Sequence, residues 1–215
     1  MKLGTGLKFS VLLLGGLLAV SSARADILPS FQTVTPSTLN PGDFTWVYTV
    51  TLTDDSRLDT ASPWSELFTI FDFAGFIPGS QQSSNPDFTP SSANTGPDAF
   101  RTSPADDPGI PNITWTWTPS VTPSTVTGPI FLGVFSADSI FDQETLAAFD
   151  GQSTKNVPSP PGNKEDGTEL GNVGSATVPM PTTSTIPEPS TMLLLAGGLL
   201  GLALIGRQKI SHKNN

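Results

Sequence analysis

The 215-residue sequence contains no cysteine and a single histidine, His212, close to its C-terminal end. The absence of cysteine excludes disulfides, thiolate metal sites and cysteine nucleophiles. Because His212 lies in the extreme tail, the body of the chain also has no Ser-His-Asp triad and no imidazole ligand for zinc. We therefore expect a non-enzymatic protein with no metal and no cofactor, stabilised by its core. A glycosidase-type carboxylate pair is the remaining catalytic alternative, and its possible members are Glu66, Asp72, Asp138 and Glu144.

Basic residues are scarce in the body of the chain. Between Asp26 and Ile186 there are 18 acidic residues and four basic ones, a balance of −14. Such a charge disfavours nucleic acid and other polyphosphates, because binding would add repulsion instead of releasing counterions. The balance favours a soluble, solvated surface. Alternatively, divalent cations could bridge the acidic body to a polyanionic matrix. The sequence contains no Asp-rich calcium-binding loop that would support this alternative.

The N-terminal residues have the three parts of a secretory signal peptide. Lys2 and Lys8 precede a 12-residue apolar run at 9–20, and Ala23 and Ala25 form the small-x-small pattern that signal peptidase reads. The run is shorter than the roughly 20 residues of a membrane-spanning helix. The sequence thus predicts that residues 1–25 are removed and that the mature chain begins at Asp26 outside the cytoplasm.

Two segments alternate strictly between large apolar residues and threonine. Residues 44–53 place aromatic and aliphatic side chains on one face and threonines on the other, and residues 112–118 repeat this pattern. A period of two predicts half-buried strands, and the threonine rows are typical of their outward faces. Segments 66–73 and 130–137 are apolar on both faces, which predicts central strands. Weaker strand candidates are 31–35 and 174–180.

Only segment 142–150 has a helical pattern, of about two turns. Short strands separated by turn residues predict an all-β fold over residues 26–178, an antiparallel β-sandwich of the immunoglobulin-like or jelly-roll-like type. Residues 78–111 are rich in Pro and Ser and predict a long crossover loop. Phe88 and Phe100 in this loop are candidate ligand contacts, which leaves a carbohydrate-binding module open as an alternative function.

The C-terminal residues combine a tether, an apolar run and basic residues. Residues 179–191 are rich in Pro and Thr and should be extended, whereas 192–206 is apolar all round. As a helix the apolar run would span about 22 Å, which makes a short transmembrane helix. Arg207, Lys209 and Lys213 in the tail 207–215 have the charge that keeps the end of a stop-transfer segment in the cytoplasm.

The arrangement resembles the PEP-CTERM sorting signal of Gram-negative bacteria, also labelled the ice-binding protein C-terminal domain. Pro187, Glu188 and Pro189 match its motif, 192–206 matches its helix, and the basic residues match its third part, although they are not adjacent arginines. The resemblance implies an inner-membrane-anchored precursor processed by an exosortase, a membrane-embedded transpeptidase or protease. The product would then reach the cell surface or extracellular matrix, where exopolysaccharide is a possible partner. The expected role is structural or adhesive in a biofilm.

Overall fold

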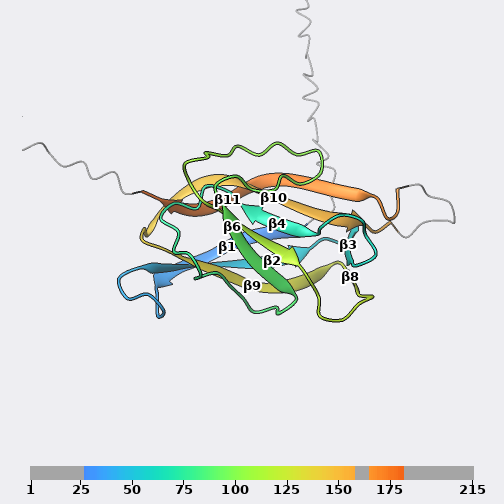
Figure 1. Ribbon diagram of the computed structural model, residues 1–215, viewed down its shortest axis with the longest axis horizontal. Coiled ribbons are helices and arrows are strands. Elements are labelled where there is room, and N and C mark those ends of the chain that lie inside the picture. The colour runs from blue at the N-terminus through green and yellow to red at the C-terminus, as the bar shows by residue number, and fades with distance from the viewer. Residues whose placement is uncertain (1–26, 158–164, 182–215) are drawn as a thin grey trace, which may run out of the picture.

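The computed structural model describes residues 27–157 and 165–181, and the regular secondary structure of this part of the chain consists of β-strands, with no helix (Figure 1). Two antiparallel sheets pack face to face, so the predicted all-β sandwich is confirmed. The first sheet has the strand order β1 (Ile27–Pro36), β2 (Phe44–Leu52), β9 (Ile130–Ser139), β5 (Gln82–Ser83). The second has the order β6 (Phe88–Ala93), β7 (Asn112–Trp117), β4 (Leu67–Ile70), β10 (Gln143–Lys155), β3 (Ser56–Asp59), β8 (Thr125–Thr127).

A long hairpin completes the second sheet. Strand β11 (Glu169–Met180) pairs with β10 over twelve residue pairs. Residues 149–152 of β10 pair with β11 on one edge and with β4 on the other, so β10 is central and β11 lies at the edge. The predicted tether boundary at residue 179 is too early, since the last two residues of β11 are Pro179 and Met180.

The inward faces of both sheets form one aromatic core. Phe68 of β4 stacks on Trp115 of β7, with ring centroids 5.1 Å apart, and meets Phe135 of β9 edge-on at 5.0 Å. All three side chains are fully buried. Such contacts join the sheets, and each pair adds about 0.5–1.5 kcal/mol beyond the burial of apolar area.

The two alternating segments form the predicted strands. In β2 the side chains of Trp46, Tyr48 and Val50 are buried, and in β7 the same holds for Ile113 and Trp115. The opposite face of β2 carries threonines that are at least partly exposed, but Thr114 on the opposite face of β7 is only 5% exposed, so the prediction of a half-buried strand is wrong for β7. The alternation therefore correctly predicts which side chains face the core.

Segment 130–137 differs from the prediction of a strand buried on both faces. Its strand, β9, buries Leu132 and Phe135, but Phe131 is 56% exposed and Val134 38% exposed. The outer face of the first sheet is open to solvent at these positions. In β9, the presence of apolar side chains on both faces therefore did not indicate that both faces are buried.

The predicted helix at 142–150 is wrong, because these residues form the first part of β10. Two helical turns of favourable sequence are a weak preference, and tertiary pairing overrides it. Here β11 supplies a complete antiparallel partner for the segment, and β4 pairs with its end.

The predicted crossover loop 78–111 is also partly wrong, since it contains β5 and β6. The longest part outside these strands, residues 94–111, lies over the second sheet on its outer side (Figure 1). We call residues 94–111 the covering loop. The backbone N–H of Ala99 donates to Asp150 of β10 and that of Phe100 donates to Gln152, each at 2.8 Å.

Candidate functional site

The predicted sorting and processing residues lie outside the described part of the chain. These are the cleavage residues Ala23, Ala25 and Asp26, the motif Pro187, Glu188 and Pro189, and the basic residues Arg207, Lys209 and Lys213. The same holds for the predicted helix at 192–206. Among residues 27–157 and 165–181, no helix is long and apolar enough to cross a membrane.

The two candidate ligand residues are placed very differently. Phe88 opens β6, pairs in register with Trp117 of β7 and is only 4% exposed. It packs edge-on against Phe135 in the core at a centroid distance of 5.2 Å. The prediction that Phe88 contacts a ligand is therefore wrong. Phe100, in the covering loop, is 37% exposed, and the guanidinium carbon of Arg101 lies 4.7 Å from its ring centroid.

Asp138 of β9 is a buried carboxylate that orders a turn. It accepts hydrogen bonds from Ser37 Oγ (2.5 Å), Asn40 Nδ2 (2.7 Å) and Thr45 Oγ1 (2.6 Å). These donors lie on β2 and on the connection between β1 and β2. Asp138 thus ties that connection to the first sheet, and three donors from the chain itself occupy its oxygens.

Glu66 is a second buried carboxylate, placed just before β4. It accepts from the backbone N–H of Asp59 (2.6 Å), from Thr154 Oγ1 (2.5 Å) and from Ser62 Oγ (3.3 Å). Burial raises the pKa of Glu66 to about 7, although these hydrogen bonds oppose the shift. The residue borders an open pocket of about 370 Å³, but its oxygens are used within the fold.

Asp150 of β10 is a third buried carboxylate, which no motif or spacing in the sequence distinguishes from the other acids. Its Oδ2 accepts from the Ala99 N–H (2.8 Å) and from Thr102 Oγ1 (3.2 Å), while its buried Oδ1 has no hydrogen-bond partner among the described residues. Burial raises the pKa of Asp150 to about 6. Asp150 fastens the covering loop to the sheet.

The four acids considered as glycosidase candidates lie in different surroundings, and Glu66 and Asp138 are described above. Asp72 accepts from the backbone N–H of Asp107 (2.8 Å), and Glu144 is exposed on β10. Within the described ranges no hydrogen bond joins two of the four, and no group of three or more His, Cys, Asp or Glu side chains could hold a metal ion.

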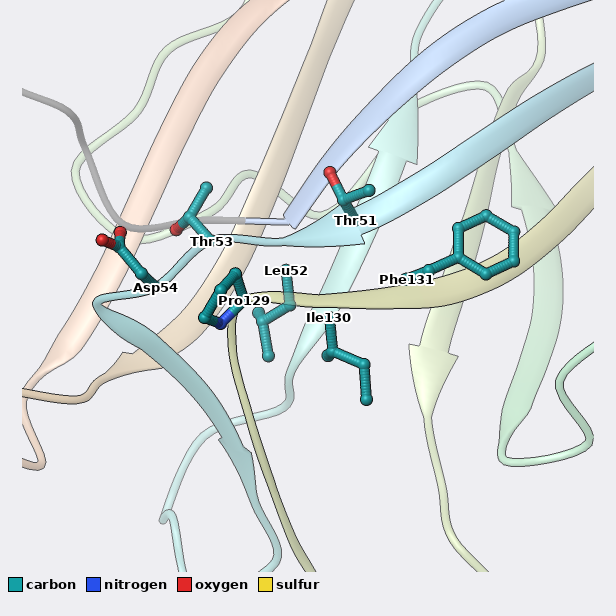
Figure 2. A pocket seen from close by; sticks show the side chains of 7 residues that line it. All are labelled: Thr51, Leu52, Thr53, Asp54, Pro129, Ile130 and Phe131. Atoms are coloured by element: carbon teal, nitrogen blue, oxygen red, sulfur yellow. The ribbon is translucent and has the colours of Figure 1, made fainter.

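One open pocket lies where β2 ends and β9 begins (Figure 2). It has a volume of about 550 Å³. Its polar groups are two threonine hydroxyls and the carboxylate of Asp54, and its apolar lining includes Phe131. Figure 2 shows the side chains of Thr51 and Thr53 on one side of the two neighbouring ribbons, β2 and β9. Those of Leu52 and Ile130 point to the other side. The polar and apolar groups therefore do not converge on one point.

The family comparison concerns the C-terminal residues. The model of the PEP-CTERM protein-sorting motif matches residues 185–208. The chain carries a PEP-CTERM sorting motif. The resemblance of the tail to this signal is therefore confirmed. No curated protein and no solved structure matches the chain.

The PEP-CTERM match includes Pro187, Glu188, Pro189 and Arg207, whereas Lys209 and Lys213 lie beyond it. A sorting motif of this class implies export, processing by an exosortase and membrane-associated sorting to the cell surface. The match does not reach the β-sandwich, so it carries no information on what the folded body binds.

Proposed function

We propose that the chain is a non-catalytic, exported protein of a Gram-negative bacterium, with a structural or adhesive role at the cell surface or in the extracellular matrix. The match of the PEP-CTERM motif to residues 185–208 carries this proposal. In it, signal peptidase removes residues 1–25, an exosortase processes the tail, and the β-sandwich is the part displayed in an exopolysaccharide-containing biofilm. The buried acids support a non-catalytic body, since hydrogen bonds within the fold occupy Glu66 and Asp138.

In this proposal the composition of the motif has a physical reason. Prolines on both sides of Glu188 lack a backbone N–H and restrict the chain, so the motif cannot join a sheet ladder as a regular strand. It stays accessible to a membrane enzyme while the apolar residues 192–206 hold the precursor in the bilayer.

The test is alanine replacement of Pro187, Glu188 and Pro189 in the native host. Intact mass spectrometry should show tail removal in the wild type and retention in the triple variant. A matched triple-alanine variant at 182–184, immediately before the matched residues, should be processed normally. Equal retention of the tail in wild type and motif variant would refute the sorting proposal.

A second candidate function is binding of carbohydrate by the body. One observation favours it: Phe100 is an exposed aromatic ring held on an anchored loop beside an arginine. Pockets for small ligands are lined mainly by apolar and aromatic side chains, with a few polar or charged groups that fix the ligand's orientation.

A further inference from the structure

The covering loop meets the β10–β11 hairpin at a pocket of about 660 Å³. It is lined by the connection before β4, the covering loop, the end of β10, the turn at 165–168 and the start of β11. Its lining contains two aromatic rings, two basic side chains and two carboxylates, which are Trp64, Phe100, Arg101, Lys155, Glu165 and Glu169.

All three basic side chains of the described residues lie in or near this pocket, together with several carboxylates. The basic side chains of the described residues are Arg57, Arg101 and Lys155, in a strongly acidic body. Arg101 and Lys155 line the pocket, and a Cβ added to its residue Gly167 would lie 3.3 Å from the Arg57 guanidinium. Lys155 pairs with Glu165 at 2.6 Å and Arg57 with Asp166 at 2.8 Å.

Arg101 differs from the other two bases. Its guanidinium lies over the Phe100 ring, and no carboxylate of the described residues forms an ion pair with it. It is also exposed. An exposed arginine presents hydrogen-bond donors in a fixed fork that matches a carboxylate in two places.

The fold holds this pair in place. The N–H of Phe100 donates to Gln152 at 2.8 Å and the neighbouring Ala99 is anchored to Asp150. Arg101 has φ of 58°, a conformation that the anchors on either side maintain. A Cβ at position 171 would lie 2.1 Å from the Phe100 carbonyl oxygen, so glycine at 171 permits the close approach.

We propose that this pocket binds a carboxylated sugar, such as a uronic acid residue of an acidic polysaccharide. The ligand's carboxylate pairs with Arg101 and Lys155, and its apolar C–H face lies against Trp64 and Phe100. Its hydroxyl groups donate to Glu165, Glu169 and Thr168. The inference rests on the proposed carbohydrate-binding role of the body, and not on the sorting of the tail.

The mixed charge of the lining selects this ligand class. A bare phosphate or sulfate would meet the two glutamates without offering them donors, and an uncharged sugar would leave the arginine without a charged acceptor. A polyphosphate chain would also experience the repulsion of the acidic body.

The test is calorimetric titration of the full chain, purified in detergent, with a galacturonic acid tetrasaccharide. The controls are its methyl ester, which is uncharged, and inorganic phosphate. We expect the acid to bind, the ester to bind at least about tenfold more weakly, and phosphate not to compete, because a charge-assisted hydrogen bond contributes about 1.5–3 kcal/mol. Binding of the acid should weaken as salt is added.

Two variants locate the site. Arg101→Gln should weaken binding of the acid at least about tenfold, whereas Phe131→Ala, at an exposed aromatic residue of the first sheet, should leave it unchanged. Unchanged thermal unfolding of Arg101→Gln would show that the loop is intact. No binding at millimolar sugar, equal binding of acid and ester, competition by phosphate, or an unaffected Arg101→Gln variant would each overturn the proposal. These results leave the tail-processing test untouched.

Discussion

The backbone N–H of Ala99 donates to Oδ2 of Asp150, 2.8 Å away, and joins residues 51 positions apart. This hydrogen bond connects an exposed loop to the central strand of the second sheet, through a carboxylate that the loop itself buries. The position of Phe100 and Arg101 therefore depends on the hydrogen bond between Ala99 and Asp150, which lies beneath the loop.

Replacement of Asp150 should release the covering loop. Asp150→Ala leaves the Ala99 N–H without an acceptor, whereas the Thr102 hydroxyl keeps its hydrogen bond to the Ala99 carbonyl, and we expect a loss of about 1–3 kcal/mol in the free energy of unfolding. Asp150→Asn keeps one acceptor oxygen and should lose less. Urea unfolding followed by tryptophan fluorescence gives the stability, and hydrogen exchange of the Ala99 and Phe100 amides reports the loop. Slow exchange in Asp150→Ala would contradict this role.

Stability should fall as the pH rises from about 4 to about 7. The pKa of Asp150 is raised from 3.8 to about 6 and that of Glu66 from 4.5 to about 7, so the folded state binds protons more tightly than the unfolded state. The stabilisation is complete below the unfolded pKa values and is lost as pH passes the folded ones. The loss should be about 3 kcal/mol for each carboxylate.

Glu66→Gln should flatten this pH dependence, since it removes one of the two titrating groups. The exposed Glu165→Gln variant is the matched control and should keep the descending slope. Urea titrations across the same pH range measure both. A slope that rises with pH in the wild type would show that other groups dominate.

Gly171 should not tolerate a side chain. A Cβ there would lie 2.1 Å from the Phe100 carbonyl oxygen, so either the covering loop or β11 must move. We expect Gly171→Ala to cost about 1–3 kcal/mol, as overpacking does, and Ser175→Ala at an exposed position of the same strand to change stability by less than about 0.5 kcal/mol. Thermal unfolding compares the two, and equal midpoints would argue against the close contact.

The two faces of β9 should respond differently to truncation. Phe135→Ala removes a buried ring that meets Phe68 and Trp115, and should cost about 3–5 kcal/mol. Phe131→Ala, four residues earlier and 56% exposed, should cost less than about 1 kcal/mol. Urea unfolding of both variants measures the contrast. A large loss in Phe131→Ala would mean that the outer face of the first sheet is covered.

Short sequence patterns predicted the features that depend only on neighbouring residues, namely the alternating strands and the sorting motif. Strand β2 and strand β7 followed from alternation, because the large apolar side chains of each lie on the face that packs in the core. The sorting motif could be identified because it is a short linear signal that the family model also matches.

Properties that depend on distant partners could not be predicted in this way. Segment 142–150 is a strand because residues after 169 pair with it. Phe88 and Phe100 lie in the same Pro- and Ser-rich segment, and only the pairing of Phe88 with Trp117 places one in the core and leaves the other exposed. The pocket around Arg101 joins residues from position 64 to position 170, which no spacing along the chain indicates.

The long hairpin at the edge of the second sheet also has a mechanical consequence. The chain leaves the described fold directly after β11, so tension on the C-terminal segment enters the sandwich through this strand. A pull along the strand axis would shear the twelve β10–β11 pairs together, whereas a perpendicular pull would open them one at a time from Met180. The direction of an external force on the C-terminal segment would therefore determine how large a force is needed to separate β11 from β10.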